Sequence, residues 1–345
     1  MGHGLPVYST IGADMMASIP QKPQISIVII FHNSQTFLPK CVESCLGQTL
    51  NDIEIICVDD ASTDDTWSLL CQYASQDVRL RPLHHHVNMM NLMSRKHGIE
   101  NAKGEYVVLL DGDDFLALDA CEKIVTALTN HDSPDILQYG TSIVDDLDQI
   151  REDLPQIDAL LAPLGERLSG WDVFFSCFRD NKYCHTLWNK AYRRGLLTAA
   201  LRYVNNDRVY RGDDVYLYFA ISLLARSYDS VNNKLVFYRR GELPESKGFR
   251  MTRHDFDLIG NCALAAKGVR MLPARLGLTD PDIYSVASAV SSSLLRQSEG
   301  MLANLGIPIR FLPRYLATFG LSGVRMLHRN PGFPHAVQTR REVSS

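Results

Sequence analysis

Residues 25–66 read ISIVIIFHNSQTFLPKCVESCLGQTLNDIEIICVDDASTDDT. Two runs in this stretch, Ile25–Phe31 and Ile53–Val58, consist mostly of large apolar residues, many of them β-branched. Such runs are typical of strands that are buried on both faces of a parallel sheet. Between the two runs, apolar residues recur at spacings of three and four over residues 37–46, which predicts a helix. The order strand, helix, strand indicates an α/β fold.

The same alternation continues along the chain to about residue 144. Strands that alternate with helices of this length predict a doubly wound α/β layer, with a mostly parallel sheet and helices on its faces. Residues 145–168 are acidic and contain proline, so we expect more loop than helix or strand there, and from about residue 255 onward the pattern is helical. The other expected elements are helices over 66–73, 92–101, 119–130 and 215–225, and strands over 79–83, 106–110, 135–144 and 235–238.

The length of 345 residues corresponds to about two domains. We expect residues 1–24, which mix Gly, Pro, Ser and Met without periodicity, to form a loose tail. An α/β domain should follow over residues 25–250, with a first half at 25–115 and a second half at 116–250. Residues 251–345 should then form a helical C-terminal region.

Composition and charge exclude several classes of protein. The formal net charge is -4, so no global positive field draws a nucleic acid to the chain. The eight cysteines include no C-x-x-C pair, and several lie in apolar runs, where reduced cysteine behaves as a small hydrophobic residue. We recognise no signal peptide and no apolar run of the roughly 18 residues that a membrane helix needs. We therefore expect a reduced, soluble, cytoplasmic protein.

Polar side chains follow three of the expected strands, at the point where each strand ends. In open α/β sheets, ligands bind beyond the carboxyl ends of the strands. A single aspartate at such a position can be explained as a helix N-cap without any ligand. Paired carboxylates that recur at one edge of the sheet instead point to a hard cation or a hydroxyl-rich ligand. These residues are His32 and Asn33 after the first strand, Asp59 and Asp60 after the second, and Asp111, Asp113 and Asp114 after the fourth.

Other binding motifs are missing or fail on geometry. No G-x-G-x-x-G follows the first strand, and the chain has no G-x-x-x-x-G-K-[ST] loop. The run that starts at Asp111 resembles the start of an EF-hand, but Phe115 and Leu116 occupy positions that need an oxygen ligand and a glycine. The run His84–His86 invites a zinc interpretation, yet consecutive residues alternate across a strand and cannot chelate one ion together.

Residues 25–66, followed by SRKHGIENAKGEYVVLLDGDD at 94–114, resemble the nucleotide-binding half of the family 2 glycosyltransferases. A D-x-D alone is a weak signal, but here the strand, VDDAS, AKGEY and DGDD occur in the family's order. The similarity covers about residues 25–240. It implies the Rossmann-like GT-A fold and an inverting transfer of a sugar from a nucleotide-diphosphate donor, usually with Mg²⁺ or Mn²⁺.

The resemblance also implies how the donor nucleoside is bound. Asp60 matches the position that hydrogen-bonds the uracil ring, and His32 and Asn33 match the turn that lines the nucleoside. Arg95 matches an arginine near the base and the phosphates. The donor is therefore expected to be a UDP-sugar.

Asp111 and Asp113 match the D-x-D of the family. Asp113 is the expected direct metal ligand, and Asp111 is expected nearer the ribose while also serving the metal. Oxygen ligands suit Mg²⁺ or Mn²⁺, and the metal neutralises the departing diphosphate. We expect Asp114 to cap the turn that follows.

The catalytic base is expected in the second half of the α/β domain. Residues 211–215, RGDDV, open an expected helix and resemble the family's G-E-D, which makes Asp214 the base and puts Asp213 in the glutamate position. The alternative is a helix N-terminus whose dipole favours acids. Residues 187–194 resemble the W-x-K-x-[YF]-R-R segment, so Trp188 and Lys190 are secondary candidates; Trp188 could equally belong to the core.

The C-terminal segment, residues 300–345, holds six arginines and one glutamate, with aromatic and leucine residues between them. One interpretation is an interfacial helix on anionic lipid, which suits a lipid-linked acceptor and would place the protein at the inner face of the cell membrane. The other is an ordinary helix that packs its apolar face on the domain.

These observations predict a metal-dependent inverting glycosyltransferase that acts on a hydroxyl of a glycan or a lipid-linked acceptor, in polysaccharide or glycolipid synthesis. Two alternatives stay open. A nucleotidyltransferase also uses carboxylates and a metal at a sheet edge, and a catalytically silent module could bind nucleotide-sugars without turnover.

Overall fold

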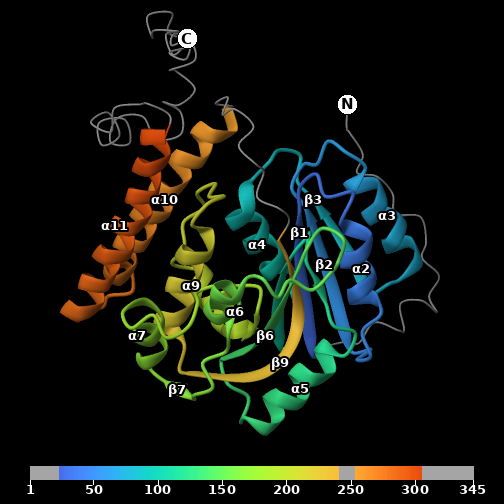
Figure 1. The fold of residues 1–345 in the computed structure, drawn as a ribbon, viewed down its shortest axis with the longest axis horizontal. Coiled ribbons are helices and arrows are strands. Elements are labelled where there is room, and N and C mark those ends of the chain that lie inside the picture. Colours follow the sequence, from blue (N-terminus) through green and yellow to red (C-terminus); the bar gives the residue numbers. More distant parts are fainter. Residues whose placement is uncertain (1–22, 241–252, 305–345) are drawn as a thin grey trace, which may run out of the picture.

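The computed structural model describes residues 23–240 and 253–304, which form a central sheet with helices on both faces (Figure 1). The strands are β1 (Ile25–Phe31), β2 (Ile53–Asp59), β3 (Leu80–His84), β4 (Tyr106–Asp111), β5 (Phe115–Leu116), β6 (Ile136–Val144), β7 (Leu168–Ser169), β8 (Lys190–Arg193) and β9 (Ser227–Arg239). The helices are α2 (Leu38–Leu46), α3 (Thr66–Gln76), α4 (Met90–Asn101), α5 (Ala120–Asn130), α6 (Pro155–Leu161), α7 (Asp172–Phe178), α8 (Arg194–Leu201), α9 (Asp213–Leu224), α10 (Arg253–Arg275) and α11 (Pro281–Asn304).

The sheet runs in the order β3-β2-β1-β4-β8-β6-β9-β5, and β7 pairs with β9. The first four strands in this order are parallel, and their register sets Phe31 beside Asp59 and Ile30 beside Asp111. β8 runs antiparallel to both β4 and β6, so the second half of the sheet is mixed. The predicted α/β fold is confirmed, and the parallel pairing belongs mainly to its first half.

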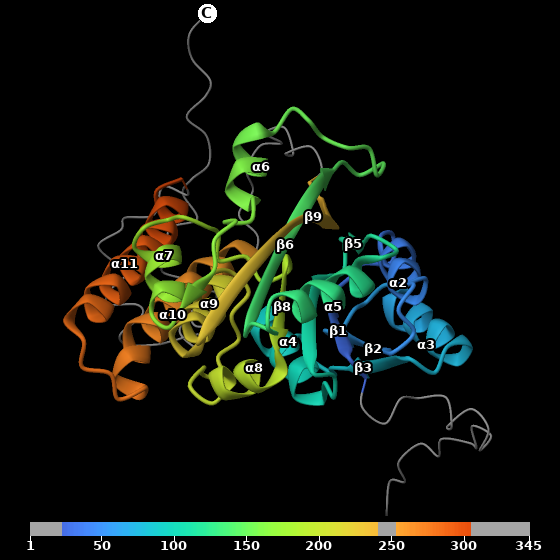
Figure 2. The ribbon, with the colours of Figure 1, turned by 90° about the horizontal axis from the view of Figure 1, so that it is seen from below.

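Alternating residues of the buried strands supply two separate cores. In β1, Val28 and Ile30 pack toward α4, α8 and α9, whereas Ile27 and Ile29 pack toward α2, α3 and α5. This division follows from the two-residue period of a strand, and both layers of helices are visible on either side of the sheet in Figure 2. Both faces of β1 therefore need apolar side chains along most of its length.

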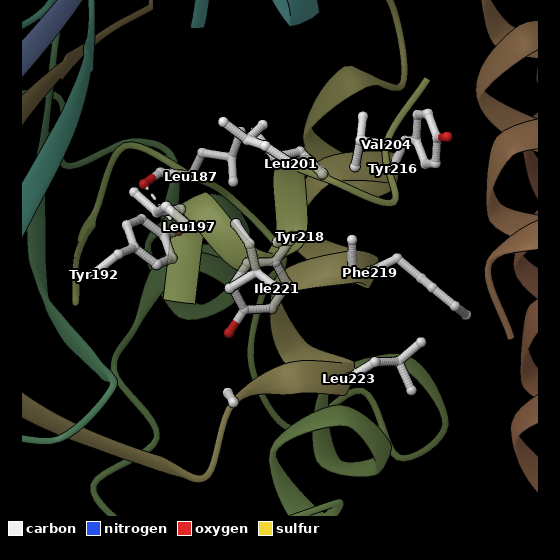
Figure 3. Close-up of a cluster of buried hydrophobic side chains, with 14 of the residues drawn as sticks. Leu187, Tyr192, Leu197, Leu201, Val204, Tyr216, Tyr218, Phe219, Ile221 and Leu223 are labelled. Carbon is white, nitrogen blue, oxygen red and sulfur yellow. Dashed lines mark hydrogen bonds between the residues drawn. The ribbon is translucent and has the colours of Figure 1, made fainter. Parts of the chain in front are cut away.

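The helix that carries the predicted base is buried along most of its length. In α9, Tyr216, Tyr218 and Phe219 are fully buried in a cluster with residues of α8, and Figure 3 shows this cluster. Gly212, directly before α9, has a φ of +82°, and a Cβ there would lie 3.0 Å from Leu294 in α11. The C-terminal helices thus pack closely against the turn that starts α9, and the positive φ at Gly212 favours glycine there.

The structure refines two sequence-based expectations about secondary structure. Residues 145–168 are mostly loop, as expected, but they also contain the short helix α6 and the first residue of β7. α6 has seven residues and buries only Leu161, so it has almost no amphipathic signal. β9 has 13 residues and extends well before the expected 235–238, because exposed Asn232 and Asn233 and a shift in register opposite Gly140 interrupt its alternation.

Parts of two expectations lie outside the described residues. The loose tail expected at 1–24 falls almost wholly in residues 1–22, and most of the arginine-rich segment falls in residues 305–345. The helical C-terminal region is confirmed over residues 253–304, where α10 and α11 form a hairpin against α9. None of the helices in the described ranges is both long and apolar enough to cross a membrane.

Candidate functional site

The predicted site residues gather at the carboxyl edge of the parallel strands. Asp60 follows β2, and its backbone N–H donates to the carbonyl oxygen of Phe31 at the end of β1. Asp111 ends β4, the next strand on the other side of β1. Helix α4 contributes Arg95 to this edge, and the start of α9 contributes Asp213 and Asp214.

Arg95 is the centre of the acidic cluster. Its guanidinium is buried, and its Nη2 lies 2.6 Å from Asp111 Oδ1. Its Nη1 forms an ion pair with Asp213 and lies 3.2 Å from Asp214 Oδ1. One side chain of α4 thus joins the D-x-D strand to the helix of the predicted base, and a bidentate, always charged guanidinium is suited to this task.

The two acids at the start of α9 differ in access. The side chain of Asp213 is 7% exposed, whereas that of Asp214 is 30% exposed. Burial raises the pKa of the Asp213 carboxyl well above its usual range, and the charge of Arg95 opposes this shift. Asp213 is therefore placed to hold Arg95, and Asp214 is the more accessible of the two acids.

The D-x-D turn is packed tightly against β1. A Cβ on Gly112 would lie 2.4 Å from the Phe31 ring and 2.8 Å from the carbonyl oxygen of Ile30, so no other residue fits there. Asp114 is buried, and its Oδ1 accepts a hydrogen bond of 2.7 Å from the backbone N–H of Arg239. The expectation that Asp114 caps the following turn is wrong, because its carboxylate instead anchors the end of β9.

Arg239 supports the same turn and was not found from the sequence. Its Nε donates to the carbonyl oxygen of Asp113 at 2.9 Å, and its Nη2 lies 2.5 Å from Asp148 Oδ1. Its guanidinium also lies over the ring of Phe37, 4.6 Å from the centroid. No local motif marks Arg239, because its partners are brought together only by the pairing of β9.

The charge of this cluster favours a cation. Asp111, Asp213 and Asp214 share the positive charge of Arg95. At Asp113, desolvation by the surrounding turn together with the charge of Asp111 raises the pKa of the carboxyl to about 6. Within residues 23–240 and 253–304, no three His, Cys, Asp or Glu side chains are arranged to hold a metal ion. Mg²⁺ usually takes only one or two carboxylates together with substrate phosphates, so the oxygen donors of the D-x-D fit such an ion.

His32, Asn33 and Asp60 lie together at the end of β1 and β2. A ring N–H of His32 donates to the carbonyl oxygen of Asp60 at 2.8 Å, and the backbone N–H of Asn33 donates to Ser62 Oγ at 2.9 Å. His32 and Asn33 are exposed, whereas Asp60 is buried. The structure thus brings the three predicted nucleoside residues to one place, with Asp60 as the deepest of them.

Trp188 and Lys190 are interior residues. Trp188 is buried and stacks on Tyr238, as the core interpretation expects. Lys190 is fully buried, and its Nζ donates to the carbonyl oxygens of Cys184 and Thr186 at 2.9 and 2.6 Å. Burial lowers the pKa of Lys190 to about 8. Both side chains hold the 184–189 segment against the sheet.

Comparison with known proteins agrees with this geometry. The model of "Glycosyl transferase family 2" matches residues 26–199, which is half of the chain. The chain is 27% identical over 274 residues to glycosyltransferase GlyG of Streptococcus pneumoniae, an alignment that covers 73% of this chain and 84% of GlyG.

Two further similarities have lower coverage or identity. EpsH of Bacillus subtilis, named as a glycosyltransferase, is 27% identical over 227 residues, which cover 64% of this chain and 61% of EpsH. The chain thus spans about six tenths of the length of this relative. Among solved structures, S. aureus TarS in complex with UDP-GlcNAc has a TM-score of 0.55 at 15% identity, covering 85% of this chain and 79% of that one. At this identity the similarity to TarS shows the fold.

Proposed function

Because this chain belongs to glycosyl transferase family 2, we propose that it moves a sugar from a nucleotide-diphosphate donor to a hydroxyl group of a glycan or lipid-linked acceptor, with inversion at the anomeric carbon. The observation that carries this proposal is the cluster in which Arg95 joins the D-x-D strand to two acids of α9. A UDP-sugar is the proposed donor, since the structurally similar TarS binds UDP-GlcNAc.

Asp111 and Asp113 would hold Mg²⁺ or Mn²⁺ beside the diphosphate of the donor. The metal would supply the positive charge that stabilises the departing diphosphate. Gly112 lets the turn lie close to β1, and Arg239 and Asp114 hold the turn from the β9 side. These contacts fix the backbone of the turn that carries the two carboxylates before the donor arrives, which contributes to the preorganisation that charge stabilisation requires.

Asp214 is the proposed base. The acceptor oxygen attacks the anomeric carbon, the bond from that carbon to the diphosphate oxygen breaks, and the carboxylate of Asp214 takes the proton of the acceptor hydroxyl. Attack from the side opposite the leaving diphosphate inverts the anomeric centre. Asp214 suits this role better than Asp213 because its side chain is 30% exposed and faces the edge where the D-x-D lies.

The first prediction concerns the metal. We expect Asp113→Ala to weaken Mn²⁺-dependent binding of UDP by at least about tenfold, because the diphosphate charge is then less neutralised. Calorimetric titration of UDP with Mn²⁺, and again with EDTA, measures this effect. Asp132→Ala is the matched control, since Asp132 is 84% exposed and pairs with Arg167 away from the site. Equal UDP affinity in Asp113→Ala and the control would contradict the proposed metal ligand.

A further inference from the structure

The histidine run 84–86, at the end of β3, makes hydrogen bonds that are separate from the acidic cluster around Arg95. His85 Nδ1 lies 2.8 Å from Asp60 Oδ1, and His85 Nε2 lies 2.8 Å from His97 Nδ1. The planes of the two imidazole rings are nearly parallel, with an interplanar angle of 9°. Asp60, His85 and His97 thus form a continuous chain of hydrogen bonds from the nucleoside edge to α4.

The chemistry of the three groups fixes the direction of these bonds. A carboxylate only accepts, so His85 Nδ1 must carry the proton that it donates to Asp60. In a neutral ring, His85 Nε2 then accepts, and His97 Nδ1 must donate. Burial, with a further contribution from His85, lowers the pKa of His97, which favours the neutral form of the His97 ring. The tautomers of both rings are therefore set by Asp60.

Asp60 has one oxygen site left for a ligand. Its Oδ1 accepts from His85 and, at 2.7 Å, from the backbone N–H of Met89, which fills both lone pairs. Its Oδ2 accepts from the backbone N–H of Met90 at 2.8 Å, and one lone pair remains. Met90 has a φ of +67°, a conformation that a non-glycine residue keeps only when its surroundings hold it.

From this geometry we propose that His85, supported by His97, is a positioning residue for the base of the donor nucleotide. It holds the Asp60 carboxylate so that the free lone pair of Oδ2 faces an N–H of the base. This inference rests on the proposed function, with a UDP-sugar as the donor, and on the sequence-based expectation that Asp60 hydrogen-bonds the uracil ring. Uracil carries an N–H at N3 and cytosine does not, so the positioned lone pair favours UDP over CDP.

The chain offers a matched control one residue away. His84 Nδ1 lies 2.8 Å from Asp59 Oδ2, so His84 makes the same kind of bond to the neighbouring aspartate. Asp59 ends β2 and is fully buried. If losing a histidine–aspartate hydrogen bond merely loosened the end of β2, His84→Leu and His85→Leu should weaken nucleotide binding equally.

The test is calorimetric titration of UDP and CDP, each with Mn²⁺, into the full chain and its variants. We expect His85→Leu to bind UDP roughly tenfold more weakly while CDP binding is unchanged, because one charge-assisted hydrogen bond that orients Asp60 is lost. Asn carries its amide nitrogen near the position of Nδ1, so His85→Asn should restore most of the preference for UDP. His97→Leu should lose part of it, and His84→Leu should retain it.

Two further measurements separate the possible failures. Pyrophosphate with Mn²⁺ probes the diphosphate site alone, and its affinity should be equal in all variants. If Asp60→Asn loses the preference for UDP and His85→Leu keeps it, the inference about His85 is wrong and the proposed nucleoside site stands. If the unaltered protein shows no preference, or Asp60→Asn keeps it, the role of Asp60 fails and the inference fails with it.

Discussion

Arg95→Ala should lower the free energy of unfolding by about 3–5 kcal/mol and abolish measurable sugar transfer. The substitution removes the buried cation that faces Asp111 and Asp213 and leaves the 7% exposed carboxylate of Asp213 without its counterion. Arg95→Lys keeps a charge but has one nitrogen, which cannot contact both Asp111 at the end of β4 and Asp213 at the start of α9, so the loss of stability should be intermediate. Urea unfolding measures the stability of each variant.

The pH dependence of Arg95→Ala identifies the cause of its instability. Burial already raises the pKa of Asp213, and removing Arg95 raises it further, so the folded state binds a proton that the unfolded state has released. The free energy of unfolding of Arg95→Ala then falls as the pH rises from about 4, the pKa of an aspartate in the unfolded chain. Its loss relative to the unaltered protein should therefore be smaller at pH 5 than at pH 8. Both measurements need EDTA, so that bound metal does not contribute.

Arg167→Ala is the control for this prediction. Arg167 is 52% exposed and pairs with exposed Asp132, so its loss should change stability by less than about 1 kcal/mol. The prediction is contradicted if Arg95→Ala loses no more free energy of unfolding than the control, or loses the same amount at pH 5 and pH 8. Either result would show that Arg95 does not compensate buried carboxylates.

Asp214→Asn should lower the rate of transfer by roughly 10²- to 10⁴-fold with little change in affinity for the donor. Asparagine keeps the shape and hydrogen bonding of the side chain but cannot take the proton. Because that proton moves only in the transition state, the loss should appear in kcat and not in UDP binding. A transfer assay beside calorimetric titration of UDP and Mn²⁺ separates the two quantities.

Asp213→Asn is the comparison for Asp214→Asn. Asp213 is buried against Arg95, so we expect Asp213→Asn to lower the free energy of unfolding more than Asp214→Asn does. Turnover that is unaltered in Asp214→Asn would remove Asp214 as the base, and Asp213 would be the next residue to test.

The donor-binding half could be predicted from sequence because its signals are local. Its strands β1, β2 and β4 are mostly apolar on both faces; His32 and Asp60 directly follow the first two, and Asp111 ends the third. Elements without a strong local pattern could not be predicted in this way. Helix α6 buries only one residue, and the exposed polar pair at 232–233 interrupts the alternation of β9.

The contacts that organise the site could not be predicted in the same way. Arg95 was expected near the base and the phosphates, but its partner Asp213 lies 118 residues later in the chain. Arg239 reaches Asp113 across 126 residues, and the role of His85 depends on a helix that returns His97 to it. Such pairings are set by the topology of the sheet, which no short motif records.

The central claim is that this site releases a nucleoside diphosphate from a sugar donor. The most direct measurement incubates the protein with a panel of UDP-sugars and Mn²⁺ and follows the products. We predict slow release of UDP from at least one donor, with water as the default acceptor, and loss of that release in EDTA and in Asp113→Ala. Release of pyrophosphate would instead indicate a nucleotidyltransferase, and binding without any release would indicate a silent module; either result would contradict the account.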